Sequence, residues 1–155
     1  MDWGVRIGKD ANKATYYRHL SEPFTVLHIA THGISDNASD SSGLVLRRAA
    51  TLGAGDFDGI EILGTQEIRK SRLNGRLVVL AACDSALSAA SDTLALAFLS
   101  AGVTEVVAAR WKIDDLATKA FMTEFYKSIA TGRSTASALR TARAAMIQSP
   151  YLLFS

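Results

Sequence analysis

The segment from Arg76 to Cys83, Arg-Leu-Val-Val-Leu-Ala-Ala-Cys, constrains the fold most, because its apolar residues do not alternate with polar ones. A strand with one face in water alternates between apolar and polar residues, whereas a strand in a parallel sheet is covered on both faces and is apolar almost throughout. The pattern therefore predicts a strand inside a parallel sheet. The run stops abruptly at Asp84-Ser85.

Two further runs predict neighbouring strands. Residues 24–32 are rich in apolar and β-branched side chains, and a polar loop is predicted from Gly33 onward. Residues 103–111 follow a helical stretch, 92–101, for which Gly102 is the predicted C-terminal stop. A strand, a helix and another strand in this order indicate a parallel crossover.

Other segments predict the helices and strands around such a sheet. Helices are predicted at residues 11–20, 65–71, 115–131 and 135–148, with Gly132 as the stop of the third and Ser134 at the start of the fourth. Shorter strands are predicted at 3–7, 43–48 and 59–63, the last two as a hairpin. In the third helix one stripe is apolar, the spacing of a face packed on a sheet: Leu116, Ala120, Phe121, Phe125 and Ile129. The order of elements predicts an α/β fold, a three-layer α-β-α sandwich with a mostly parallel sheet.

Composition narrows the functional class. A chain of 155 residues that is 48% hydrophobic is sized for one globular domain. Its 17 basic and 15 acidic residues are spread along the whole length, so no basic stripe exists to bind nucleic acid. With one cysteine and no apolar signal-peptide core at the start, we expect a cytoplasmic protein. No apolar run approaches the roughly 20 residues that a membrane span needs.

The ligand crevice of an open α/β sheet lies at the carboxyl ends of its strands. This rule brings His32, Gly33, Cys83, Asp84 and residues 111–115 to one rim. A cysteine thiolate with a nearby imidazole can attack a carbonyl, and backbone N–H groups, here those of Gly33 and Cys83, can bind the resulting oxyanion. A strand-end cysteine is also often a small core residue, so residue types alone leave both interpretations open.

Metal and cofactor sites are not predicted. His28 and His32 would lie about 13 Å apart along a strand, too far for both to bind one ion. We expect His28 to be a core residue and His19 a surface residue. The glycine-rich segment 53–59 lacks the strand, long helix and lysine of a phosphate-binding loop, and the acidic loop 36–40 fits no calcium pattern.

Two blocks carry a family resemblance: residues 28–33, His-Ile-Ala-Thr-His-Gly, and residues 77–85, Leu-Val-Val-Leu-Ala-Ala-Cys-Asp-Ser. They resemble the signature blocks of the CHAT domain, a bacterial branch of the caspase-like peptidases related to caspases and separase. Further similar blocks are residues 42–46, 96–102, 106–115, 125–126 and 138–140. The resemblance implies that residues 1–155 form a single caspase-like domain that lacks its N-terminal part and its last strand.

The same resemblance implies an activity. Members of the family are cysteine endopeptidases that cleave protein substrates, with His32 and Cys83 matching the catalytic dyad. By similarity to separase, Asp115 would line the S1 pocket and favour a basic P1 residue. Asp84, on the same rim, is expected to bind the substrate as well. An aspartate at the start of a helix is also a favoured N-cap, and capping of the following helix by Asp114 or Asp115 weighs more than the pocket role.

Functions other than peptidase activity remain open at this point. The chief one is a non-catalytic caspase-fold interaction or signalling module, against which the presence of both His32 and Cys83 argues. A nucleotide binder is a weaker alternative, because no glycine fingerprint follows a strand. CHAT domains are commonly fused to or paired with tetratricopeptide-repeat segments, so the resemblance implies such a regulator as a partner besides a protein or peptide substrate.

Overall fold

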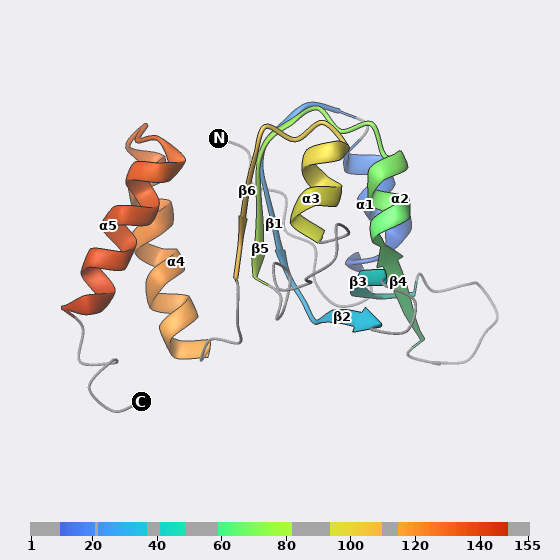
Figure 1. Cartoon of the computed structure of the whole chain (residues 1–155), viewed down its shortest axis with the longest axis horizontal. Coiled ribbons are helices and arrows are strands. Elements are labelled where there is room, and N and C mark those ends of the chain that lie inside the picture. Colours follow the sequence, from blue (N-terminus) through green and yellow to red (C-terminus); the bar gives the residue numbers. More distant parts are fainter. Residues whose placement is uncertain are drawn as a thin grey trace. The chain divides into compact units, whose positions relative to one another are not determined.

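The main sheet, sheet A, is formed by three parallel strands. The computed structural model describes residues 10–20, 22–36, 41–48, 59–81, 94–109 and 115–148. Sheet A contains β1 (Phe24–Ala30), β5 (Gly75–Ala81) and β6 (Glu105–Ala108) in the order β1-β5-β6 (Figure 1). Helix α3 (Leu94–Ser100) lies between β5 and β6 in the chain. The predicted parallel crossover is therefore confirmed.

Strand β5 is covered on both faces, as its composition predicts. Four consecutive residues, Leu77 to Leu80, are each at most 2% exposed, although successive side chains of a strand lie on opposite faces. Val78 and Leu80 belong to the main core, where Phe98 of α3 is fully buried. The α/β class with a mostly parallel main sheet is thus confirmed.

A second sheet, sheet B, is antiparallel and has the order β2-β3-β4. Its strands are β2 (Gly33–Asp36), β3 (Ser41–Arg47) and β4 (Ile60–Gly64). The predicted hairpin is confirmed as β3 and β4. The loop predicted from Gly33 is wrong for the residues of β2, because pairing with β3 gives this polar segment a regular ladder that its local composition does not indicate.

Two short helices complete the first part of the fold, α1 (Lys13–Leu20) and α2 (Thr65–Lys70). Both add apolar side chains to the core shared by sheet A, sheet B and α3. An ion pair joins the two helices: Lys13 Nζ lies 2.7 Å from each carboxylate oxygen of Glu67. Glu67 also accepts the backbone N–H of Gly64 at 3.1 Å, which satisfies a free donor at the start of α2.

The last two helices, α4 (Asp115–Ala130) and α5 (Thr135–Ile147), pack against each other. Gly132, with a φ of 80°, ends α4 as predicted, and Ser134 caps α5 by accepting the backbone N–H of Ser137 at 3.3 Å. Phe125 is fully buried, whereas Leu116, at the start of the predicted apolar stripe, is 65% exposed.

By its contacts the chain divides into two compact units, residues 1–112 and residues 113–155. The expectation that residues 1–155 form one domain lacking its N-terminal part and last strand stays a prediction. In the described ranges no helix is both long and apolar enough to cross a membrane.

Candidate active site

The carboxyl ends of β1 and β5 lie side by side at the same level. The two strands are parallel neighbours, and their last residues, Ala30 and Ala81, are register partners. His32 comes two residues after Ala30, and Cys83 comes two residues after Ala81. Cys83 and Asp84 lie outside the described residues. The adjacency of the two strands is the geometric condition that a dyad of His32 and Cys83 requires.

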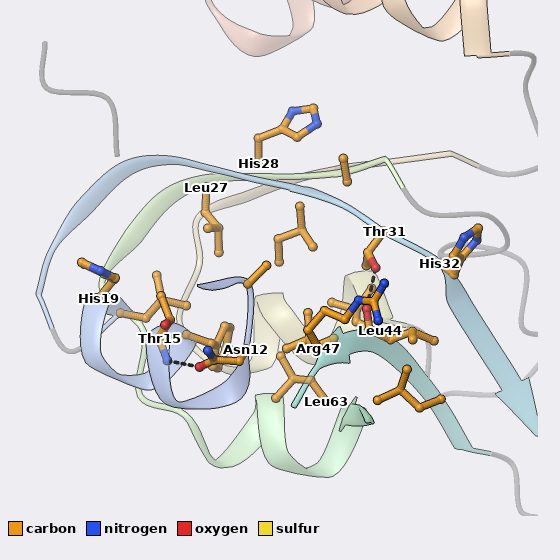
Figure 2. A pocket seen from close by; sticks show the side chains of 18 of the residues that line it. Asn12, Thr15, His19, Leu27, His28, Thr31, His32, Leu44, Arg47 and Leu63 are labelled. Atoms are coloured by element: carbon orange, nitrogen blue, oxygen red, sulfur yellow. Dashed lines mark hydrogen bonds between the residues drawn. The ribbon is translucent and has the colours of Figure 1, made fainter. Parts of the chain in front are cut away.

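His32 lies in a two-residue link between the two sheets, after the end of β1 and before the start of β2. Its side chain is exposed, whereas Thr31 beside it is partly buried. The backbone N–H of Val45 in β3 donates to the carbonyl of His32 at 2.9 Å, and the hydroxyl of Thr31 donates to the carbonyl of Val45 (Figure 2). A single residue of sheet B therefore holds both residues of the link.

Gly33 is the first residue of β2 and is paired with Leu44. Residue pairs of an antiparallel ladder alternate between hydrogen-bonded and non-hydrogen-bonded ones. Because the preceding pair, His32 with Val45, carries the bond from Val45 N–H to the His32 carbonyl, Gly33 and Leu44 form a non-hydrogen-bonded pair. The N–H of Gly33 thus points away from β3 and is not used in the β2–β3 ladder.

Asp115 is the first residue of α4, in the second compact unit. The other acidic residues considered for the substrate pocket or for helix capping, Asp84 and Asp114, lie outside the described residues. Neither the pocket role nor the capping role of Asp115 is decided by the position of the helix start.

A cavity of about 710 Å³ adjoins the link at His32. Its described lining includes residues on both faces of β1 and none of β5, so it follows the outer edge of β1, with α1, β3 and β4 forming the other walls (Figure 2). The side chains that line it are largely apolar, and none of those described is a carboxylate. The sequence patterns did not predict this cavity, because it depends on how α1 and sheet B are placed along β1.

All three histidines of the chain line this cavity, but each belongs to a different part of the fold (Figure 2). His19 lies on α1, His28 on β1 and His32 in the link after β1. His28 and Leu27 project to opposite sides of β1 (Figure 2). Within the described ranges, no three or more His, Cys, Asp or Glu residues come together in a way that could hold a metal ion.

The predictions for the two histidines outside the dyad have different outcomes. His19 is exposed, as predicted. The prediction that His28 is a core residue is wrong, because its side chain is exposed on the side of β1 opposite Leu27 (Figure 2). The surrounding protein still removes water from the imidazole, and this desolvation lowers the pKa of His28.

Comparison with known proteins identifies one family. The family model described as the CHAT domain matches residues 3–152, nearly the whole chain. In a search of curated proteins, no protein matches the chain.

Proposed function

Because the chain belongs to the CHAT domain family, which is caspase-like, we propose that it is a cysteine endopeptidase in which Cys83 is the nucleophile and His32 moves the proton. The observation that carries this proposal is the register of β1 and β5, in which Ala30 is the partner of Ala81. His32 and Cys83 follow these two residues at the same sequence distance. Neighbouring parallel strands that end at one level can present a base and a nucleophile to the same bond.

In the proposed reaction, His32 accepts the thiol proton and the Cys83 thiolate attacks the carbonyl carbon of the scissile peptide bond. The tetrahedral intermediate collapses when the C–N bond breaks and the His32 imidazolium donates its proton to the leaving amine. This leaves a thioester on Cys83. Water, deprotonated by His32, then attacks the thioester, and the departing thiolate completes the cycle.

The oxyanion of each intermediate is proposed to bind the backbone N–H groups of Gly33 and Cys83. The alternation of the β2–β3 ladder supports the first of these donors, because the N–H of Gly33 is not directed to β3. A donor that is already fixed by a strand costs no reorganisation when charge develops on the substrate oxygen.

For specificity we retain the proposal that Asp115 favours substrates with Arg or Lys at P1, and that Asp84 contributes to substrate binding. A carboxylate pairs well with a guanidinium, so Asp115→Asn should lower cleavage after Arg or Lys more than cleavage after other residues. A cleavage pattern that is the same in wild type and Asp115→Asn would contradict the pocket role. We further propose a cytoplasmic setting and control by a tetratricopeptide-repeat partner.

The experiment is cleavage of a defined peptide library, read by mass spectrometry, with the purified chain and three variants. Cys83→Ala and His32→Ala should each lower cleavage by roughly a thousandfold or more. His19→Ala is the matched control, since His19 is exposed on α1 and no role is assigned to it. Cleavage that survives Cys83→Ala would refute the proposal, and a folded wild type that cleaves nothing would favour the non-catalytic interaction module.

A further inference from the structure

Thr31 and His32 are the two residues that connect sheet A to sheet B. β1 ends at Ala30 in sheet A, and β2 begins at Gly33 in sheet B. Because the side chain of His32 is exposed, core packing does little to fix its direction. The direction depends instead on how the backbone of the link is held.

One residue of β3, Val45, holds both residues of the link. Its N–H donates to the carbonyl of His32 at 2.9 Å, and its carbonyl accepts the hydroxyl of Thr31 (Figure 2). In a regular ladder this pair would exchange two backbone bonds, and the carbonyl of Val45 would accept the N–H of His32. In the described structure the hydroxyl of Thr31 donates to the carbonyl of Val45, in place of the N–H of His32.

We propose that Thr31 is a positioning residue, whose hydroxyl acts through Val45 to set the orientation in which His32 meets Cys83 and the substrate. This inference rests on the proposed function. Threonine suits the role because its branched Cβ restricts χ1, and its hydroxyl supplies the proton that the carbonyl of Val45 accepts. Valine keeps the shape of threonine without the donor, and serine keeps the donor without the branch.

Removal of the hydroxyl should reorient the link. In Thr31→Val the carbonyl of Val45 loses this partner, and the N–H of His32, which would donate to it in a regular ladder, is a donor that can replace it. The peptide between Thr31 and His32 must rotate for that bond to form, and the imidazole moves with it. Displacement of a catalytic group by about 1 Å can cost up to a hundredfold in rate.

The test compares the full chain with Thr31→Val, Thr31→Ser and a matched control, Thr25→Val. Thr25 is an exposed threonine of β1, the strand that precedes the link. We expect Thr31→Val to lower kcat by about 10- to 100-fold with KM within about twofold, because Thr31 does not contact the substrate in the proposed mechanism. Thr31→Ser should retain kcat within about threefold, and Thr25→Val should match wild type.

A second measurement is independent of activity. The NMR signals of the His32 imidazole and backbone amide should shift in Thr31→Val and stay close to those of wild type in Thr31→Ser. If no cleavage is detected in wild type, the proposed function fails, and these NMR signals alone decide whether Thr31 positions His32. The inference is overturned if Thr31→Val leaves the His32 signals unmoved, or if Thr31→Ser moves them as much as Thr31→Val does.

Discussion

Ala30 and Ala81 are register partners at the carboxyl ends of two adjacent parallel strands. This relationship places the ends of β1 and β5 at the same edge of sheet A. After Ala30, the chain crosses into sheet B and is held there by β3. After Ala81, it continues to Cys83, which is the single cysteine of the sequence. The proposed chemistry depends on a histidine whose backbone is held just after β1 and on the cysteine that follows β5 in the sequence.

The core between sheet A and α3 should respond sharply to loss of volume. Phe98 is fully buried in α3, so Phe98→Ala should lower the free energy of unfolding by about 3–5 kcal/mol. The neighbouring Leu99 is 44% exposed, and Leu99→Ala should change the free energy by less than about 1 kcal/mol. Urea unfolding followed by circular dichroism measures both, and similar losses in the two variants would contradict the described packing of α3.

Substitutions at two glycines with positive φ, Gly102 and Gly132, should distinguish the cost of backbone strain from the cost of a steric clash. At Gly132, with a φ of 80°, an added Cβ would meet no atom within 4 Å, so Gly132→Ala should cost about 1 kcal/mol from conformation alone. At Gly102, with a φ of 111°, the Cβ would lie 2.5 Å from the carbonyl oxygen of Leu73. Gly102→Ala should therefore cost roughly 2–4 kcal/mol, and equal unfolding midpoints for the two variants would count against the close approach of Gly102 to Leu73.

The ion pair between Lys13 and Glu67 should make stability depend on pH. Burial raises the pKa of Glu67, but the hydrogen bonds from Lys13 and from Gly64 N–H outweigh it, so the pKa lies below its ordinary value of 4.5. A carboxyl group whose pKa is lower in the folded state stabilises the protein above the ordinary value, and this contribution is lost as the pH falls through the folded pKa.

The expected result at pH 7 is that Glu67→Gln is less stable than wild type by roughly 0.5–1 kcal/mol, since the pair is partly exposed and screened. The gap should narrow as the pH falls below 4.5. Thermal unfolding at several pH values, with Glu22→Gln at an exposed position before β1 as the control, measures the gap. A gap that is constant from pH 7 to pH 3 would mean that the charge of Glu67 is not what stabilises the contact.

Much of the fold follows from local patterns. The unbroken apolar run of β5 predicts a strand covered on both faces, and Gly102, Gly132 and Ser134 predict helix ends correctly. Strand β2 could not be predicted, because Gly-Ile-Ser-Asp is a turn-forming composition and only pairing with β3 makes it a strand. The exposure of His28 could not be predicted either, since the composition of β1 does not indicate how far each of its faces is covered.

The candidate site was predictable only in part. Residue types and strand ends singled out His32, Gly33 and Cys83, but they could not give the order of strands that makes β1 and β5 neighbours. The contribution of Thr31 was also missed, although it lies within the same sequence block as His32. Its partner, Val45, is 14 residues away on another strand, and no local pattern relates the two.

The pH dependence of alkylation of Cys83 by iodoacetamide tests the proposed dyad most directly. Because the chain has one cysteine, the rate reports this thiol without further assignment. If His32 activates Cys83, wild type should react well below pH 8.5, the ordinary thiol pKa, and His32→Ala should require roughly that pH, while His19→Ala follows wild type. Superimposable profiles for wild type and His32→Ala would contradict the dyad.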